Sequence, residues 1–245
     1  MRSLLALDRG NDSLKAALFV GGAIAERFRI RGAGAEETAA LVRRLRPDRI
    51  AASCVVPAWR AALETALGER FPALFWAGHD SPLPFRLDVE DPRSVGSDRL
   101  AAAAGAAARG SSSAVVVDAG TAVTVDILSS GIFTGGAIMP GLGLMLDALH
   151  RGTAALPALD PGEAAGEESR GLPGRSTRTA IAAGTVGGYI GGVTALVGRS
   201  LEMTTPGAVV YLTGGGAPLL AGRLSPDPVL APDLVLEGLC SIFAR

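Results

Sequence analysis

Residues 4–11, LLALDRGN, are an apolar run that ends in an Asp-x-Gly-Asn box. The same signal recurs at residues 114–121, where AVVVDAGT is an apolar run followed by Asp-x-Gly-Thr. In both copies a carboxylate comes at the end of a predicted buried strand, and a glycine stands where the backbone is expected to turn tightly. The repetition predicts a chain built from two similar halves.

Two such turns that face each other can hold a metal-bound polyphosphate, because successive backbone N–H groups in a turn bind anions. A third glycine-rich turn, TGGG at residues 213–216, can complete this cradle. The first box also contains the single Asn of the chain, Asn11, and is followed closely by its single Lys, Lys15. A compositional bias of the genome explains why Lys and Asn are rare, but not why the single Asn and the single Lys lie within five residues of each other. An ammonium and a compact amide suit phosphate contacts, so the pattern predicts a nucleotide-dependent phosphotransferase.

The bulk composition excludes several other classes of protein. A net charge of −1 argues against a nucleic-acid-binding face. The two cysteines, Cys54 and Cys240, do not make a disulfide framework, and we expect reduced, buried thiols in a cytoplasmic protein. Residues 179–198 carry no charge and are long enough to span a bilayer, but six glycines make them weakly hydrophobic. We therefore expect a buried helix, suited to close approach of another helix or subunit, and no membrane span.

The order of predicted elements indicates the fold class. Helices and strands alternate, and the first strands of each half are linked as hairpins, so the class is α/β with mixed β-sheets flanked by helices. The stretch 110–113, GSSS, is typical of a linker, which places the predicted domains at 1–112 and 113–245. Residues 157–176 are rich in Pro, Gly, Glu and Ser, and predict a mobile surface loop.

A third box, Gly96-Ser97-Asp98-Arg99, lies before a predicted alanine-rich helix. An Asp close to a bound hydroxyl can accept its proton, and an Arg can bind a carboxylate through two parallel hydrogen bonds. The same residues also fit the start of a helix, where an acidic side chain interacts favourably with the helix dipole. A further carboxylate, Asp126, belongs either to the site or to a strand end that faces solvent.

Taken together, the boxes resemble type III pantothenate kinases, within the acetate kinase/sugar kinase/Hsp70/actin superfamily, over nearly the whole chain. The matching elements, in order, are Asp8-x-Gly10-Asn11 with Lys15, residues 53–57 (SCVVP), Gly96-x-Asp98-Arg99, Asp118-x-Gly120-Thr121 with Thr124 and Asp126, residues 135–141 (GGAIMPG), residues 153–157 (TAALP), Ser176-Thr177, and residues 213–215 (TGG). The resemblance implies two duplicated ribonuclease H-like domains with a nucleotide cleft between them.

The resemblance also implies an activity, which is ATP-dependent phosphorylation of pantothenate by a cytoplasmic homodimer, the first step towards coenzyme A. Asp98 would be the general base on the pantothenate hydroxyl, and Asp118 would coordinate a monovalent cation, K⁺ or NH₄⁺. Asp8 would hold Mg²⁺. The other implied contacts are those of ATP with Asp8, Gly10, Asn11, Asp12, Lys15 and Thr121, and those of pantothenate with Val89, Gly96, Ser97, Asp98, Arg99 and Thr177.

Two positions depart from the family's pattern. Asp12 stands where the first box normally has Thr or Ser, and a carboxylate cannot donate to a phosphate oxygen and repels it. Binding of the metal, or pairing with Arg9 or Lys15, would make Asp12 tolerable. Val89 stands where a Tyr usually lines the pantothenate pocket, which removes a hydroxyl and aromatic surface. The rival hypotheses are a catalytically impaired paralogue with a binding or regulatory role, and a kinase for a different small hydroxyl acceptor.

Overall fold

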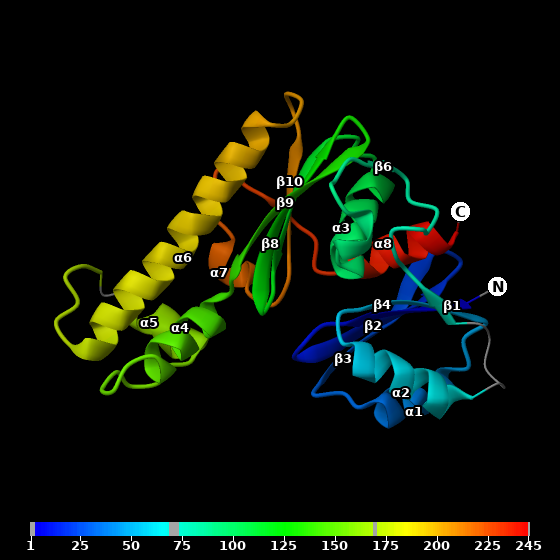
Figure 1. The fold of residues 1–245 in the computed structure, drawn as a ribbon, viewed down its shortest axis with the longest axis horizontal. Helices are drawn as coiled ribbons and strands as arrows, with labels where there is room; N and C mark the ends of the chain where they lie inside the picture. Colours follow the sequence, from blue (N-terminus) through cyan, green and yellow to red (C-terminus); the bar gives the residue numbers. More distant parts are fainter. Residues whose placement is uncertain (1–2, 69–73, 169–170, 245) are drawn as a thin grey trace. The chain divides into compact units, whose positions relative to one another are not determined.

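The computed structural model describes residues 3–68, 74–168 and 171–244, and in it the chain forms two compact units (Figure 1). The first unit contains residues 1–112, 131–134 and 233–245, and the second contains residues 113–130 and 135–232. The division into domains 1–112 and 113–245 stays a prediction. The structure adds that residues 233–245 pack within the first unit.

The first unit is a mixed five-stranded sheet with helices on both faces. Its strands are β1 (Ser3–Arg9), β2 (Ser13–Val20), β3 (Ala23–Arg31), β4 (Arg49–Cys54) and β5 (Leu74–Trp76), and its helices are α1 (Ala35–Leu45), α2 (Pro57–Leu67), α3 (Ser97–Ala108) and α8 (Leu234–Phe243). The strand order is β3-β2-β1-β4-β5, with β1 antiparallel to β2 and parallel to β4. Helices α1 and α2 cover one face of the sheet, and α3 and α8 cover the other (Figure 1).

Strand β1 places its residues alternately on the two faces of this sheet. Leu5 and Leu7 are fully buried and belong to a core cluster that includes Trp59 of α2. Burial of each such leucine stabilises the fold by roughly 1.5–3 kcal/mol. Because side chains alternate along a strand, Ala6 and Asp8 point to the opposite face, where α3 and α8 pack. The strand that builds the core therefore also carries the first acidic residue to its end.

Helices α3 and α8 pack with their backbones almost in contact. A Cβ atom added at Gly238 would lie 1.7 Å from the carbonyl oxygen of Ala101, and one added at Gly105 would lie 2.1 Å from that of Leu234. The alanine-rich sequence of α3 allows this approach, because small side chains leave little to separate the helices. The two glycines thus fix how closely α8 covers the first unit.

The second unit is built on the strands that follow the linker. They are β7 (Ala114–Ala119), β8 (Ala122–Ser129), β9 (Ile132–Pro140), β10 (Val209–Thr213) and β11 (Val229–Leu230), and the helices are α4 (Leu142–Arg151), α5 (Pro161–Glu168), α6 (Thr177–Glu202) and α7 (Ala217–Leu220). The sheet has the order β11-β10-β7-β8-β9-β6, in which the short β6 (Arg86–Leu87) pairs with Ile132 and Phe133 at the start of β9. Those two residues of β9 belong to the first unit.

The two units repeat one strand arrangement. The order β3-β2-β1-β4-β5 of the first sheet has its counterpart in β9-β8-β7-β10-β11 of the second. In both, the first strand pairs antiparallel with the next strand of a hairpin and parallel with a later strand. The predicted α/β class with two mixed sheets flanked by helices is therefore confirmed, and the duplication suggested by the two boxes extends to the topology.

Helix α6 runs along one face of the second sheet (Figure 1). It is the one helix among the described residues that is long and apolar enough to cross a membrane, which is weak evidence of a span. Ile181, Val186 and Tyr189 on one side are buried in the core of the unit. The side that carries Gly184 and Gly188 is exposed, so the prediction of a buried helix is correct for one side only.

One sequence prediction of local structure is wrong. The described part of residues 157–176 contains helix α5, where a mobile loop was expected. Asp160 accepts hydrogen bonds from the backbone N–H groups of Gly162 and Glu163, at 2.8 and 3.0 Å, and so caps the start of the helix. Ala164 is fully buried, which attaches the helix to the core cluster beside α6. The composition of the segment, rich in Pro, Gly, Glu and Ser, does not indicate this N-terminal cap or the buried Ala164.

Candidate active site

Three polar residues lie side by side at the end of the first sheet. Asp8 of β1 is opposite Lys15 of β2 in the antiparallel register and opposite Ser53 of β4 in the parallel register. Residues opposite each other on neighbouring strands project to the same face, so the ammonium, the carboxylate and the hydroxyl form one row. Two members of this row, Asp8 and Lys15, are predicted site residues that strand pairing brings together.

Ser53 orients the carboxylate of Asp8. Its hydroxyl donates a 2.8 Å hydrogen bond to Asp8 Oδ1, and both residues are buried, with Asp8 only 6% exposed. A buried carboxylate needs such a partner, because its desolvation is costly. Ser53 belongs to the SCVVP segment of the resemblance, but the sequence assigned it no role.

The turn after β1 consists of residues 10–12 and is held by its own backbone and by Arg9. The N–H of Gly10 donates to the carbonyl of Ser13 at 3.1 Å. The Arg9 guanidinium Nη1 donates to the carbonyl of Gly10 and, at 3.1 Å, to the carbonyl of Asn11. Arg9 is only 9% exposed, so this cation lies within the protein behind the turn.

The role expected for the glycines of the two Asp-x-Gly boxes is not the one found. Neither Gly10 nor Gly120 is among the glycines with a positive φ. A Cβ atom at Gly10 would lie 3.7 Å from the carbonyl oxygen of Ser13, an ordinary contact. The turn itself therefore does not require glycine at position 10, and the missing side chain leaves room there. The glycine that the backbone does require is Gly214 of the third turn, with φ +92°.

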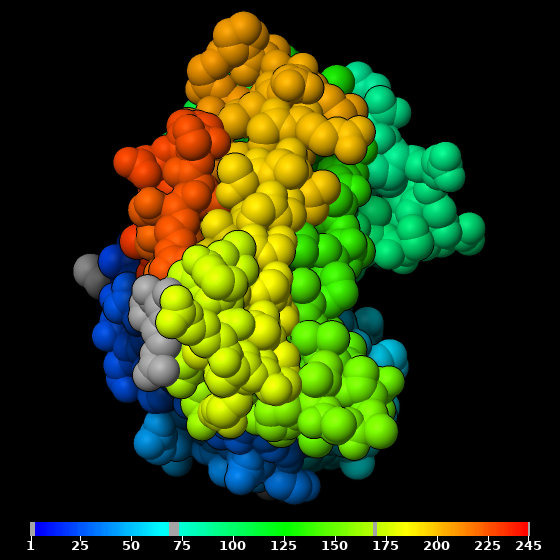
Figure 2. Space-filling view, turned by 90° about the vertical axis from the view of Figure 1, so that its left-hand side faces the viewer, coloured from blue at the N-terminus to red at the C-terminus, as the bar shows by residue number. Residues whose placement is uncertain are grey.

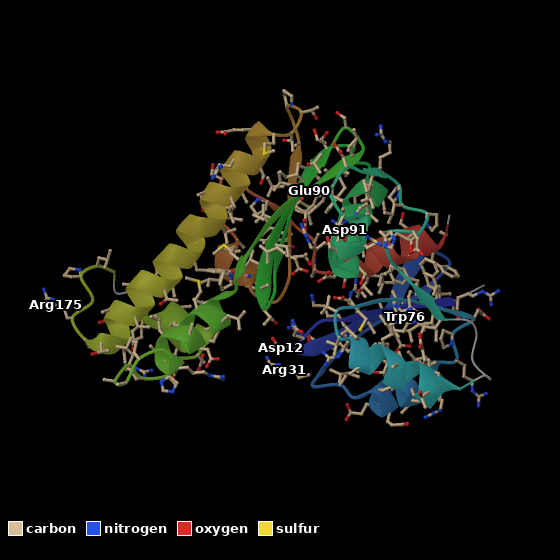
Figure 3. All side chains as sticks on the ribbon, viewed as in Figure 1. Asp12, Arg31, Trp76, Glu90, Asp91 and Arg175 are labelled. Carbon is tan, nitrogen blue, oxygen red and sulfur yellow. The ribbon has the colours of Figure 1, made fainter. Side chains whose placement is uncertain are left out.

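Asp12 lies at the exposed tip of the same turn, next to Arg31 of β3 (Figure 3). The neighbouring residue Ser13 is paired with Arg31 in the sheet, and the N–H of Gly32 donates to the carbonyl of Asp12 at 3.0 Å. The structure thus adds Arg31 as a neighbour of Asp12, and the pairing with Arg9 or Lys15 that the sequence suggested stays a prediction. Its position at the tip also keeps it at the edge of the predicted phosphate site.

The Gly-x-Asp-Arg box begins helix α3 and is tied to the Asp8 row. The backbone N–H of Cys54, which follows Ser53 in β4, donates a 3.1 Å hydrogen bond to Ser97 Oγ. Asp98 lies in the first turn of α3, where its Oδ1 accepts the N–H of Arg99 at 2.9 Å. The carboxylate folds back over Gly96, where a Cβ would lie 2.5 Å from Oδ1, so this conformation requires glycine. The box is thus both the start of a helix and a neighbour of the first box.

Two more residues of this region complete the first half of the site. The guanidinium carbon of Arg99 lies 5.8 Å from the ring centre of Phe133, so the guanidinium group packs over an aromatic face. Val89 is half-buried in the segment between β6 and α3, two residues before Asp91, which Figure 3 labels. Asp91 Oδ1 accepts the N–H of Arg93 at 3.1 Å and so begins the short 3-10 helix η1 (Pro92–Ser94).

The half-buried thiol of Cys54 stands next to these residues. Burial raises the pKa of this thiol, and the hydrogen bond with the backbone of Val56 and the charge of Arg9 act in the opposite direction. The Sγ–O distance to Val56 is 3.2 Å. Cys54 and Cys240 are both free, and both are half-buried, so the expected burial of these thiols is only partial.

The second unit carries an equivalent half-site at the end of β7. Asp118 is opposite Thr124 of β8 and opposite Thr213 of β10, the positions that Lys15 and Ser53 hold around Asp8. The backbone of Gly214 passes directly over the carboxylate, since a Cβ atom there would lie 2.4 Å from Asp118 Oδ1. The two halves of the molecule thus place an Asp in the same setting, with a hydroxyl on the parallel neighbour in both.

The turn after Asp118 is packed between two other turns. Gly141 donates its N–H to the carbonyl of Thr121 at 3.0 Å, and a Cβ at Gly141 would lie 2.5 Å from that oxygen. Gly216 donates its N–H to the carbonyl of Ala119 at 2.8 Å. The third glycine-rich turn and the GGAIMPG segment therefore both meet the second box.

The side chain of Tyr189, from helix α6 that packs on the second sheet, extends into the same region. A Cβ atom at Gly216 would lie 3.2 Å from its hydroxyl oxygen, so the phenol lies against the third turn. Burial, and then the negative charge of Asp118, raise its pKa to about 12, so the hydroxyl is protonated at neutral pH. Tyr189 was not predicted from the sequence, where it is one tyrosine in a glycine-rich helix. Thr177, by contrast, is exposed in the first turn of α6, at the end of the helix that packs beside α4 and α5.

Asp126 of β8 is 1% exposed, so the solvent-facing alternative is wrong. It pairs in the sheet with Val116, and a Cβ at Gly136 would lie 2.8 Å from the Asp126 Cα. The GG pair of the GGAIMPG segment thus allows β9 to pass close to this carboxylate.

The residues present fit the expected ions. Among the described residues, no three His, Cys, Asp or Glu side chains come together, which excludes a metal site built from three such side chains there. Mg²⁺ in kinases is held by one or two carboxylates together with substrate phosphates and waters, and Asp8 suits that arrangement. At Asp118, a carboxylate oxygen lies against the backbone of Gly214, and oxygen ligands of this kind suit a hard cation.

Comparison with known proteins identifies the family of the chain. The model of the type III pantothenate kinase family matches residues 4–199. The type III pantothenate kinase of Halorhodospira halophila is 41% identical over 248 residues, which are 96% of this chain and 95% of that protein. The corresponding protein of Alkalilimnicola ehrlichii is 37% identical, over 97% of this chain and 96% of its own length.

Solved structures support the fold. A ROK hexokinase from Thermus thermophilus superimposes with a TM-score of 0.57 at 16% identity, and the match covers 99% of each chain. At that identity the likeness concerns the fold alone, which is that of a sugar kinase. The family assignment rests on the sequence matches, and they extend over almost the entire chain. The chain belongs to the type III pantothenate kinase family.

Proposed function

We propose that this protein transfers the γ-phosphoryl group of ATP to the hydroxyl of pantothenate, forming 4′-phosphopantothenate and ADP in the first step of coenzyme A biosynthesis. The observation that carries the proposal is the family match over residues 4–199, in a chain that retains Asp8, Asp98 and Asp118 in their boxes. We place the reaction in the cytoplasm, where ATP is available.

The first unit supplies the reacting groups in this proposal. Lys15, Asn11 and the turn at residues 10–12 bind the phosphates of ATP, and Asp8, oriented by Ser53, holds Mg²⁺. The pantothenate hydroxyl oxygen attacks the γ-phosphorus while the bond to the β–γ bridging oxygen breaks, and Asp98 accepts the hydroxyl proton. Arg99 binds the pantothenate carboxylate, with Gly96, Ser97 and Val89 lining the same pocket.

The second unit contributes groups of its own. Asp118 binds a monovalent cation, K⁺ or NH₄⁺, whose charge helps neutralise the phosphates. Thr121 contacts ATP, and Thr177 contacts pantothenate. These roles are supported by the match of each residue to its box and, for Asp118, by the glycine turn that passes over its carboxylate.

We also propose that the protein is a homodimer that associates through helices α4 and α6. These helices line an apolar groove of 540 Å³ that includes Leu144, Leu149, Ala180 and Gly184. Leu144 of this groove is 44% exposed, and Ile138, two residues before Pro140 of the same groove, is 63% exposed, so apolar surface continues beside the groove. Figure 2 shows the outer side of α6 (yellow) uncovered beside α4 and α5.

The dimer is tested by sedimentation of the wild-type protein and of Gly184→Arg. Nothing lies within 4 Å of a Cβ at Gly184, so the arginine fits the monomer and would clash only with a partner. Dimeric wild-type protein and monomeric variant are the expected results. Ala158→Arg, at another exposed position of the second unit, is the control and stays dimeric. A dimer that tolerates Gly184→Arg would place the interface elsewhere.

The activity is tested by following phosphopantothenate formation with ATP, Mg²⁺ and pantothenate, with and without K⁺ or NH₄⁺. Product that depends on the monovalent cation is the expected result. Formation of ADP with another hydroxyl compound, and none with pantothenate, would favour a different acceptor, as the change to Val89 suggests. ATP binding without transfer to any acceptor would favour the impaired paralogue.

A further inference from the structure

Arg9, the buried cation whose guanidinium contacts the turn at residues 10–12, has no role in the mechanism above. Arg9 follows Asp8 in β1 and, by alternation along the strand, projects to the face where α1 and α2 pack. From there its Nη1 donates to the carbonyl of Gly10 and to the carbonyl of Asn11 at 3.1 Å. Its Nε is buried and has no hydrogen-bond partner among the described residues. A buried guanidinium with an unused donor is costly to retain, which calls for a reason beyond packing.

The two hydrogen bonds of Arg9 set the direction of the peptide units in the turn. The peptide bonds of residues 10–12 are trans, so the C=O and N–H of each unit point in opposite directions. With the carbonyls of Gly10 and Asn11 turned towards Arg9, the N–H groups of Asn11 and Asp12 are turned away from it. That is the orientation in which successive backbone N–H groups can bind an anion on the outer side of the turn.

The positive charge of Arg9 also favours binding of an anion at this turn. Both acceptors of its hydrogen bonds are neutral carbonyl oxygens, so these bonds leave its positive charge in place at the turn. The exposed carboxylate of Asp12 lies at the tip of that turn and repels a polyphosphate. A fixed cation close to the turn reduces this repulsion, and burial limits its screening by solvent.

We propose that Arg9 is a positioning residue for nucleotide binding, which aims the N–H groups of the 10–12 turn at the polyphosphate and offsets the charge of Asp12. This rests on the proposed function only in taking ATP as the ligand. Arg9 itself does not touch the nucleotide.

The test compares Arg9→Met and Arg9→Lys by calorimetric titration with Mg-ATP and by steady-state kinetics. Loss of two charge-assisted hydrogen bonds in Arg9→Met is expected to weaken ATP affinity and raise the KM for ATP by about tenfold. The KM for pantothenate stays within about twofold, because that pocket lies on α3 and the preceding segment. Arg9→Lys keeps the charge and recovers part of the affinity. Arg44→Met, whose guanidinium in the wild type lies over Phe28, is the matched control and binds ATP normally.

A double-mutant cycle with Asp12→Asn tests the electrostatic part. The effect of Arg9→Met on ATP affinity should be smaller when Asp12 is already neutral. Unchanged ATP affinity in a folded Arg9→Met protein, or equal losses for ATP and pantothenate, would overturn the proposal. If Arg9→Met does not fold, Arg9→Lys alone decides, and wild-type affinity in it with no change of the KM for ATP would also overturn it. A wild-type protein that binds Mg-ATP and phosphorylates no pantothenate would refute the proposed function but leave this test intact.

Discussion

Ser53 Oγ donates a 2.8 Å hydrogen bond to Asp8 Oδ1 between two neighbouring parallel strands, and neither residue is accessible enough for water to replace that bond. The bond holds the carboxylate of Asp8, the proposed Mg²⁺ ligand, in one orientation. Ser53→Ala should therefore raise the KM for Mg-ATP by about fivefold, the equivalent of one hydrogen bond of ~1 kcal/mol. Kinetics at varied Mg²⁺ measure it. Ser112→Ala, at an exposed serine of the same unit, is the control, and an unaffected Ser53→Ala would show that Asp8 needs no orientation.

Asp98 is the residue on which turnover should depend most directly. Asp98→Asn keeps the size of the side chain and removes the proton acceptor, so kcat should fall by about 10²–10⁴-fold. ATP affinity, measured by titration, should stay close to that of the wild type, because the phosphates are assigned to the first box. An Asn variant with substantial activity would exclude Asp98 as the general base.

A substitution of Asp12 should increase the affinity for ATP, whereas the substitutions above should impair the enzyme. Asp12→Thr replaces a repelling carboxylate by a hydroxyl that can donate to a phosphate oxygen, so ATP should bind several-fold more tightly. The comparison of ATP affinity at fixed Mg²⁺ measures the effect. Weaker binding in the variant, most of all at low Mg²⁺, would instead mean that the carboxylate serves the metal.

Two glycine substitutions should change stability with opposite signs. Gly238→Ala forces a Cβ to within 1.7 Å of the Ala101 carbonyl oxygen and should destabilise the protein by about 1–3 kcal/mol. Gly198→Ala lies in the interior of α6 with nothing within 4 Å of the new Cβ, and should stabilise the helix by about 0.5–1 kcal/mol. Urea unfolding of both variants measures the difference. Equal effects would mean that α3 and α8 are not in backbone contact.

The buried phenol of Tyr189 predicts a dependence of stability on alkaline pH. Its pKa is raised to about 12 in the folded protein from an ordinary value of 10. The folded state therefore holds this proton more tightly, and its contribution is complete below pH 10 and is lost as the pH rises through about 12. Tyr189→Phe should remove that part of the decline in unfolding free energy between pH 10 and 12. Tyr211→Phe, which alters the other tyrosine, controls for general alkaline effects, and an identical decline in Tyr189→Phe would refute the assignment.

The sequence predicted the architecture well because the architecture follows from local signals. The apolar runs before Asp8 and Asp118 and the hairpins after them determine strand pairing, and pairing alone puts Lys15 beside Asp8. The third glycine turn meets the second box by the same kind of pairing, because β10 lies parallel to β7. Both contacts follow from strand register, which the alternation of apolar and polar side chains specifies.

The residues that sequence reasoning missed depend on contacts between distant parts of the chain. Tyr189 reaches the third turn only because α6 crosses the second sheet, and nothing in its neighbours marks it. The place of α8 in the first unit depends on Gly105 and Gly238, which in the sequence are two glycines among 33. The sequence predicts a loop in place of helix α5 because one buried alanine is a weak signal beside the seven other residues of the helix, which are polar or small. The contact of Tyr189, the place of α8 and the burial of Ala164 need the tertiary structure, because each depends on a partner far away in sequence.

Helix α8 has a consequence for how the molecule is made. The first unit holds the Asp8 row and the Gly-x-Asp-Arg box, yet one face of its sheet is covered by residues 234–243. On the ribosome, β1, β4 and α3 emerge early and must wait, with apolar surface uncovered, until those residues have been synthesised and have left the exit tunnel. Residues 113–232 have all emerged by then and can collapse around their own core. The half of the enzyme that is translated first is therefore the half that is completed last.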